Sequence, residues 1–132
     1  MRVLGIESSS LVASVALITD DILTAEYTVD FKKTHSQTLL PMLDEIVKML
    51  GLDLEAIDAI AAAGGPGSFT GLRIGAATAK GLGLALKKPL IHVPTVDALA
   101  YNMWGASGLI CPINGCKEKS GVYRTLPHGK WD

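Results

Sequence analysis

The sequence predicts an α/β domain in which an antiparallel three-stranded meander joins a parallel βαβ sheet. Three observations predict this class. The first thirty residues form three apolar stretches, separated by turns so short that neighbouring strands must be antiparallel. Two later apolar stretches each follow a run with helical periodicity. The 132 residues are 48% hydrophobic and 19% charged, which is enough for one domain with its own core.

The meander is expected at the start of the chain. Strands are predicted over residues 2–6, 11–18 and 22–29. Small polar residues at 7–10 form the first turn, and Asp20-Asp21 forms a tight second turn.

The first helix is predicted to begin within residues 35–38 and to end near Leu50, with Gly51 as its stop signal. Its apolar side chains cover about half of the circumference, wider than the stripe that a single core contact needs. The extra width indicates deeper burial or a partner surface. By wheel position, the outer, partner-binding edge is assigned to Leu39, Met42, Ile46 and Met49, with Gly75 and Ala79 of the next helix opposite. The reverse assignment stays open, with the outer role taken by Leu40, Leu43, Val47 and Leu50.

A glycine-rich loop is the centre of the chain. It follows a predicted strand over residues 57–63 and leads into a predicted helix over residues 70–86. The N–H groups at such a helix N-terminus can bind an anion, so the candidate anion-binding residues are Gly65, Pro66, Gly67, Ser68, Thr70, Gly71 and Arg73. The spacing matches neither the P-loop nor the dinucleotide fingerprint. The alternative is a tight turn that only shapes the fold.

The second helix carries small residues four apart in two rows. One row is Gly71, Gly75, Ala79 and Gly83, and the other is Ala77, Gly81 and Ala85. Glycine inside a helix costs up to about 1 kcal/mol relative to alanine. The rows therefore indicate that another backbone approaches this helix closely, either from the sheet or from a second helix.

The remaining elements complete a β-β-β-α-β-α-β-α order. A strand is predicted over residues 90–93, a helix over 96–103 and another strand over 109–113. This order is that of the ribonuclease-H-like, actin-like half-fold, with right-handed crossovers. Residues 1–113 are expected to form this lobe, and residues 114–132 to begin a truncated or divergent second lobe with a frayed tail.

Composition excludes several functions. The net charge is −1 and no block of like charges appears, so direct binding of nucleic acid by this chain is not expected. No apolar run reaches the ~18 residues needed to span a bilayer. Cys111 and Cys116 lack a second ligand pair for zinc and are expected to be reduced, as in a cytoplasmic protein. Glu7, at the end of the first strand, could hold a metal only if further carboxylates converged on it; the candidates are Asp44, Asp58 and Asp97.

Three motifs resemble one known family. They are Val3-Leu4-Gly5-Ile6-Glu7-Ser8-Ser9, His35-Ser36-x-x-Leu39-Leu40-Pro41, and the run from Gly65 to Gly75, Gly-Pro-Gly-Ser-Phe-Thr-Gly-Leu-Arg-Ile-Gly. Together they resemble TsaB, also called YeaZ, over about residues 1–113. The third motif is highly specific. The resemblance implies an actin-like, non-catalytic scaffold that binds its catalytic paralogue TsaD. With TsaE it would support threonylcarbamoyl transfer to adenosine in tRNA. It also implies homodimers formed through the first-lobe helices, and no cofactor.

The residues argue against catalysis by this chain. TsaD carries a metal-binding His-x-x-x-His, and aligning the strand at residues 90–93 places Thr95 and Leu99 at those positions. Neither side chain can replace an imidazole pair, so no catalytic metal is expected. His92 and His35 are interpreted as structural. The alternatives kept open are an actin-like phosphotransferase, a glycoprotease-like metallopeptidase, and a folding domain without a function of its own.

Overall fold

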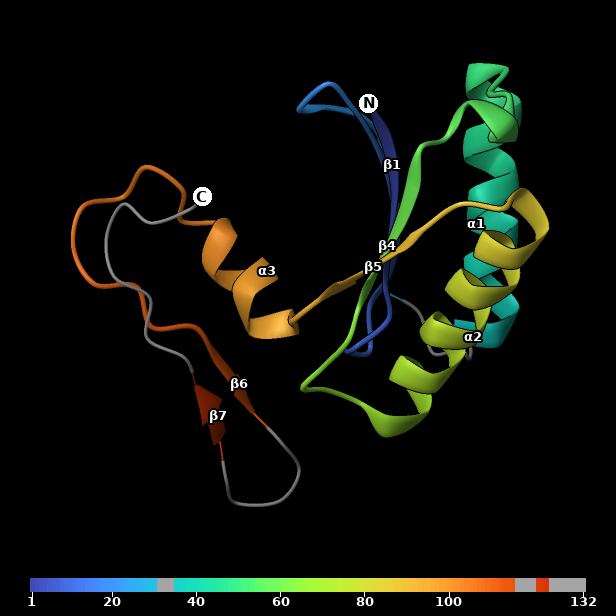
Figure 1. Ribbon diagram of the computed structural model, residues 1–132. Helices are drawn as coiled ribbons and strands as arrows, with labels where there is room; N and C mark the ends of the chain where they lie inside the picture. The colour runs from blue at the N-terminus through green and yellow to red at the C-terminus, as the bar shows by residue number, and fades with distance from the viewer. Residues whose placement is uncertain (31–34, 116–120, 124–132) are drawn as a thin grey trace.

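The fold is built on a five-stranded mixed sheet, seen nearly edge-on in Figure 1. The computed structural model describes residues 1–30, 35–115 and 121–123. The sheet has the strand order β3-β2-β1-β4-β5, and a separate two-stranded ribbon is formed by β6 and β7. The elements are β1 (Arg2–Glu7), β2 (Ala13–Thr19), β3 (Ile22–Val29), α1 (His35–Leu50), the 3-10 turn η1 (Leu54–Ala56), β4 (Ala59–Ala63), α2 (Phe69–Leu86), β5 (Leu90–Val93), α3 (Thr95–Tyr101), β6 (Ile113–Gly115) and β7 (Gly121–Tyr123).

The strand pairing confirms the predicted fold class. β1 pairs with β2, and β2 with β3, in antiparallel register, while β1 pairs with β4, and β4 with β5, in parallel. The sheet is therefore a meander extended by two parallel strands, each reached through a helix. This is the actin-like half-fold that the element order predicts.

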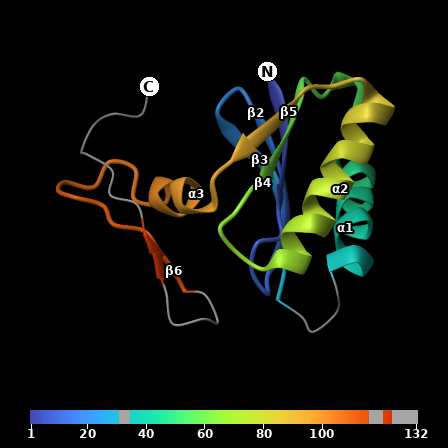
Figure 2. The ribbon, with the colours of Figure 1, turned by 60° about the horizontal axis from the view of Figure 1, so that its bottom comes forward.

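Both long helices cover one face of the sheet (Figures 1 and 2). The alternation of β1 and β2 sends Leu4, Ile6, Val15 and Leu17 to this face, where all four are buried. The core joins these strands to α1 and α2 and extends to Ile57 and Ile60. The short helix α3 lies on the other side of the sheet (Figure 2).

Several boundaries differ from the prediction. β4 begins at Ala59 rather than at residue 57, because the Ile57 amide closes the 3-10 turn by donating to the carbonyl of Leu54. The predicted strand over residues 109–113 was wrong, since β6 starts at Ile113. The Asn114-Gly115 pair, a dipeptide that is typical of turns and so predicts one here, lies in β6 instead. The predicted lobe boundary after residue 113 falls within β6 and stays a prediction, and the predicted frayed tail lies outside the described residues.

The part of the chain that the structure describes contains no helix with both the length and the apolar character needed to cross a membrane.

Candidate functional site

The glycine-rich loop between β4 and α2 is where four segments meet. The Gly64 amide donates to the carbonyl of Val93 at the end of β5, and the Thr95 amide at the start of α3 donates to the carbonyl of Gly65, both at 2.8 Å. The Ser68 amide donates to the carbonyl of Ser9 in the β1–β2 loop at 2.7 Å. The Gly65-Pro66 peptide bond is cis, and Gly65 has a φ of 99°. The loop thus ties α2 to β5, α3 and the first turn.

The start of α2 is capped from within the loop. The Ser68 hydroxyl accepts a hydrogen bond from the Gly71 amide at 3.2 Å, and the Leu72 amide donates to the Ser68 carbonyl at 2.8 Å. A Cβ on Gly67 would lie 2.4 Å from the Ser9 carbonyl oxygen, so this glycine permits close contact between two loops. These contacts favour the interpretation that the loop shapes the fold. Anion binding by the loop stays a prediction.

The remaining two candidates of the loop lie on the surface. Thr70 is exposed, and the Arg73 guanidinium lies over the Phe69 ring at 5.3 Å from its centroid. Arg73 is therefore engaged with a neighbouring aromatic ring on α2, an arrangement that is favourable in its own right.

The first row of small residues on α2 faces the sheet. The Ser8 side chain is buried and its hydroxyl donates to the Gly71 carbonyl at 2.9 Å. A Cβ on Gly75 would lie 2.1 Å from that hydroxyl oxygen, and a Cβ on Gly83 would lie 2.7 Å from the Leu90 side chain. The row predicts the close approach of another backbone, whereas the nearest neighbours at Gly75 and Gly83 are the side chains of Ser8 and Leu90. Sequence reasoning placed Ser8 in a turn and did not mark it as the partner of α2.

The second row of small residues, Ala77, Gly81 and Ala85, is exposed. A Cβ on Gly81 would have no atom of this chain within 4 Å outside the helix itself. Large apolar side chains lie on the same side of the helix: Leu84 is 84% exposed and Phe69 is 74% exposed. We call this surface the outer face of α2; its residues are Phe69, Arg73, Ala77, Lys80, Gly81, Leu84 and Ala85. No packing within the described residues explains a glycine at its centre.

The outer edge assigned to α1 is wrong for three of its four residues. Leu39, Met42 and Ile46 are 1–3% exposed and belong to the core, whereas Met49 is 74% exposed. The reverse assignment holds in part, because Leu40 and Leu50 are exposed, whereas Leu43 is buried and Val47 is half-buried.

Gly75 and Ala79, which were assigned to the same partner surface, are buried as well. These assignments were wrong because a helical wheel gives the width of an apolar arc but does not say which part of the arc faces the sheet. The sheet occupies the middle of the arc on α1, and the two ends of the arc stay at the surface. A partner role for Met49 stays a prediction.

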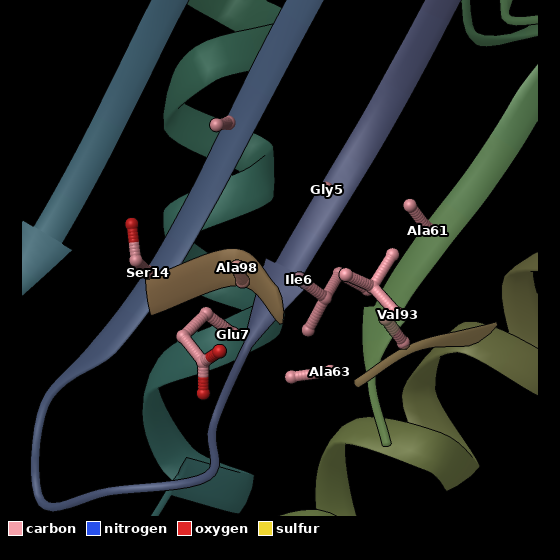
Figure 3. A pocket seen from close by; sticks show the side chains of 10 residues that line it. Gly5, Ile6, Glu7, Ser14, Ala61, Ala63, Val93 and Ala98 are labelled. Atoms are coloured by element: carbon pink, nitrogen blue, oxygen red, sulfur yellow. The ribbon is translucent and has the colours of Figure 1, made fainter. Parts of the chain in front are cut away.

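A shallow hollow lies on the face of the sheet opposite α1 and α2, beneath α3 (Figure 3). Its volume is about 190 Å³. The Glu7 carboxylate and the Ser14 hydroxyl are the polar groups shown in it, among small apolar side chains. One Glu7 oxygen accepts from the Ser9 amide at 2.5 Å, so this carboxylate caps its own turn. The lining consists of Gly5, Ile6, Glu7, Ser14, Ala16, Ala61, Ala62, Ala63, Val93 and Ala98.

Two of the carboxylates considered with Glu7, Asp44 and Asp58, do not join it. Asp44 forms an ion pair with Lys48 on α1, and this hydrogen bond raises the pKa of the Lys48 ammonium group. Asp58 accepts from the Arg2 amide at the opposite end of β1. Within the described ranges, no three His, Cys, Asp or Glu side chains gather as metal ligands would.

The positions aligned with the TsaD histidines lie on α3. Thr95 is buried and its hydroxyl oxygen has no hydrogen-bond partner among the residues that the structure describes, while Leu99 is 41% exposed. His92 is at the surface. Its ring lies so close to Gly64 that a Cβ added to this glycine would be 1.8 Å from the His92 Nε2 atom. The side chain of His35 lies outside what the structure describes.

The fold and its central loop define a class of protein. A mixed sheet in the order 3-2-1-4-5, with both crossover helices on one face, is the half-fold of the actin-like superfamily. The family model for TsaD, described as tRNA N6-adenosine threonylcarbamoyltransferase, matches residues 29–117. The chain belongs to this family, and the relatives described next connect it with TsaB (YeaZ).

Similar proteins carry the TsaB or YeaZ name. The chain is 39% identical to TsaB of Escherichia coli K12 over 108 residues, covering 82% of this chain and 46% of that protein. It is 35% identical to TsaB of Bacillus subtilis 168 over 113 residues, covering 86% and 49%. The solved structure of YeaZ from Pseudomonas aeruginosa superposes with a TM-score of 0.85 at 28% identity, covering 98% of this chain and 61% of that one. These matches confirm the resemblance, and the chain spans about half the length of the TsaB relatives.

Proposed function

We propose that this chain is a non-catalytic scaffold subunit in the synthesis of threonylcarbamoyladenosine in tRNA. In this role it binds the catalytic paralogue TsaD, together with TsaE, and forms homodimers when TsaD is absent. The names of its TsaB relatives support the pathway. The match to the TsaD family model supports the kinship between scaffold and catalytic subunit.

The outer face of α2 is the observation that carries the binding role. Glycine in the middle of an exposed helix costs about 1 kcal/mol relative to alanine, and no atom of the described residues comes close enough to a Cβ at Gly81 to explain why glycine is needed there. A helix from another protein that crosses at Gly81 would approach the backbone closely, because glycine has no side chain to keep it away. Leu84, three residues further along the helix, would then supply an apolar anchor beside the crossing point.

The absence of an imidazole pair supports a scaffold rather than an enzyme. Thr95 and Leu99 occupy the aligned positions, and a neutral hydroxyl and an aliphatic side chain are poor metal ligands. The chemistry of transfer would then be supplied by TsaD.

A binding experiment with TsaD tests the proposal. Gly81→Leu places a bulky side chain at the centre of the outer face, and the space around Gly81 lets the variant keep its fold. We expect it to weaken TsaD binding about 30-fold, the equivalent of roughly 2 kcal/mol. Ala56→Leu is the matched control, because it adds similar bulk at an exposed position in η1.

The two possible failures are distinguishable in calorimetry. If the unmodified chain does not bind TsaD, the scaffold function is wrong. If the chain binds and Gly81→Leu binds equally well, the scaffold function stands and the outer face of α2 is not its contact surface.

A further inference from the structure

β3 is an edge strand of the sheet in the part of the chain that the structure describes. It pairs with β2 on one side, and it is the last strand in the sheet order. Half of the backbone N–H and C=O groups of an edge strand point away from the sheet, where another extended segment can pair with them. The pairing with β2 is regular over residues 25–29, because the bulge between Leu17 and Ile18 lies nearer the turn. This half of β3 can therefore accept a further strand.

A groove of about 260 Å³ lies beside the same half of β3, between the strand and α1. Tyr27 and Val29 form its strand side. Its helix side is formed by residues that are mostly three or four positions apart and so share one face of α1. They are Gln37, Thr38, Pro41, Met42 and Glu45. Met42 is 3% exposed and Tyr27 is 38% exposed, so the groove combines a buried apolar floor with an accessible aromatic wall.

An edge strand beside a groove is the arrangement in which extended peptides bind by strand addition. A peptide strand added to β3 would lie about 4.8 Å from it, and every second side chain would point to the α1 side. Gln37 and Glu45 are eight positions apart, which is about 12 Å along a helix. An extended peptide covers this length in about four residues. Three alternate side chains of such a peptide would therefore face the groove.

The charges beside the groove indicate the chemistry of the peptide. Glu45 is the one charged side chain in the lining, and Glu26 is the one charged residue of β3. Neither forms an ion pair with another described residue, whereas Lys48 is paired with Asp44. A lysine or arginine of the peptide would thus find a carboxylate at Glu45 that is free of a salt bridge. Residues 20–30 carry four carboxylates and no cation, so the β3 strands of two copies would repel each other.

We propose that the groove between β3 and α1 binds an extended segment of another protein, with an apolar residue in the groove and a lysine or arginine that reaches Glu45. The backbone of the segment pairs with the outer edge of β3 over residues 25–29. Backbone pairing supplies affinity, and the side chains in the groove supply specificity. This surface is separate from the outer face of α2, so the inference does not depend on the proposed scaffold function.

A short synthetic peptide tests the groove. Acetyl-Thr-Lys-Thr-Val-Thr-Lys-Thr-amide has the same sequence in both chain directions, so it presents valine between two lysines whichever way it pairs. The peptide is titrated into the whole chain and followed by the backbone amide signals in NMR spectra. We expect the signals of residues 25–29 and 37–45 to shift to saturation, with a Kd of about 1 mM or tighter. The amides of β3 should also exchange more slowly with solvent, while the signals of α2 stay unchanged.

Matched variants test the role of charge. Glu45→Lys reverses the charge in the groove and should weaken binding of this peptide about tenfold. Glu55→Lys is the same substitution at an exposed position in η1 and should leave binding unchanged. A second peptide, with glutamate in place of both lysines, should bind the unmodified chain about tenfold more weakly than the first. This second peptide should bind Glu45→Lys more tightly than it binds the unmodified chain.

Four results would overturn the proposal. The first is the absence of saturable shifts with the lysine peptide, and the second is a set of shifts that lies outside β3 and α1. The third is equal binding of the two peptides to the unmodified chain, a comparison that holds even if Glu45→Lys fails to fold. The fourth is a shift of the β3 signals that grows with protein concentration when no peptide is present, because the edge would then pair with a second copy.

Discussion

Gly75→Ala is the substitution that most sharply tests the close contact between α2 and the first turn. The added Cβ would lie 2.1 Å from the Ser8 hydroxyl oxygen and 3.3 Å from the Ser8 Cβ. Ser8 is 1% exposed, so its hydroxyl cannot turn towards water. It must leave its bond to the Gly71 carbonyl, or the helix must move away from the sheet.

Three effects set the expected change in the free energy of unfolding of Gly75→Ala. Loss of a buried hydrogen bond costs about 1–3 kcal/mol, and overpacking a close-packed site costs about 1–3 kcal/mol. Replacing a helical glycine by alanine returns about 1 kcal/mol. We therefore expect Gly75→Ala to lower the free energy of unfolding by about 3 kcal/mol, or the melting temperature by roughly 10 °C for a chain of this size.

Gly81→Ala is the matched control for this prediction. It is the same substitution in the same helix, but the new Cβ meets no atom within 4 Å. Only the helix propensity then changes, and the variant should be about 1 kcal/mol more stable than the unmodified chain. Urea denaturation followed by circular dichroism measures both variants.

A double substitution identifies the cause. Ser8→Ala removes the oxygen that the new Cβ would strike, so adding Gly75→Ala to Ser8→Ala should cost much less than Gly75→Ala alone. The reasoning is refuted if Gly75→Ala is as stable as Gly81→Ala. It is also refuted if the cost of Gly75→Ala is the same with and without the Ser8 hydroxyl.

Three further outcomes are expected. Gly67→Val should lower the free energy of unfolding in urea by about 1–3 kcal/mol, because its Cβ would strike the Ser9 carbonyl; an unchanged midpoint would show that the loops can separate. Met42→Asp should cost about 4 kcal/mol or leave the chain unfolded by circular dichroism, since Met42 is buried; a folded variant that only loses partner binding would contradict the core assignment. Asp20→Asn should lower the free energy of unfolding by its full amount between about pH 4 and pH 8, and by progressively less on either side of this window, in a urea series across pH. The hydrogen bond with the Met1 ammonium group lowers the pKa of Asp20 from its ordinary 3.8 and raises that of the ammonium group from 8.0. The contribution of Asp20 is thus lost as pH falls through its lowered pKa, and that of the ammonium group as pH rises through its raised pKa. If the free energy of unfolding of Asp20→Asn still differed from that of the unmodified chain far outside this pH range, the ion pair between Asp20 and the Met1 ammonium group would be contradicted.

Local sequence signals were sufficient for the order of the elements. Three apolar stretches separated by short turns, such as Asp20-Asp21, predict the meander, and the structure pairs its strands in that way. The apolar run before the glycine-rich loop predicts a strand inside the sheet, and β4 lies between β1 and β5. These signals work because short turns and apolar stretches are local properties of the chain.

Contacts between distant segments could not be predicted in this way. The arc on α1 is so wide that the wheel could not say which part of it meets the sheet, and Met42 was therefore placed on the wrong side. The sequence does not show that Gly67 is needed for its contact with Ser9, nor that the positive φ of the loop belongs to Gly65. Asn114 was read as a turn residue, yet it bonds to a residue 48 positions away. Each of these depends on tertiary contacts that one sequence does not display.

We propose that the chain acts on tRNA only through TsaD, which it contacts with the outer face of α2. The most direct test of this proposal is formation of threonylcarbamoyladenosine in tRNA from a threonylcarbamoyl donor, with TsaD and TsaE present, measured by mass spectrometry of the nucleosides. We expect no product from this chain without TsaD, a clear increase when the unmodified chain is added to TsaD, and loss of that increase with Gly81→Leu but not with Ala56→Leu. Product formed by this chain without TsaD, or an equal increase from Gly81→Leu and the unmodified chain, would contradict the account.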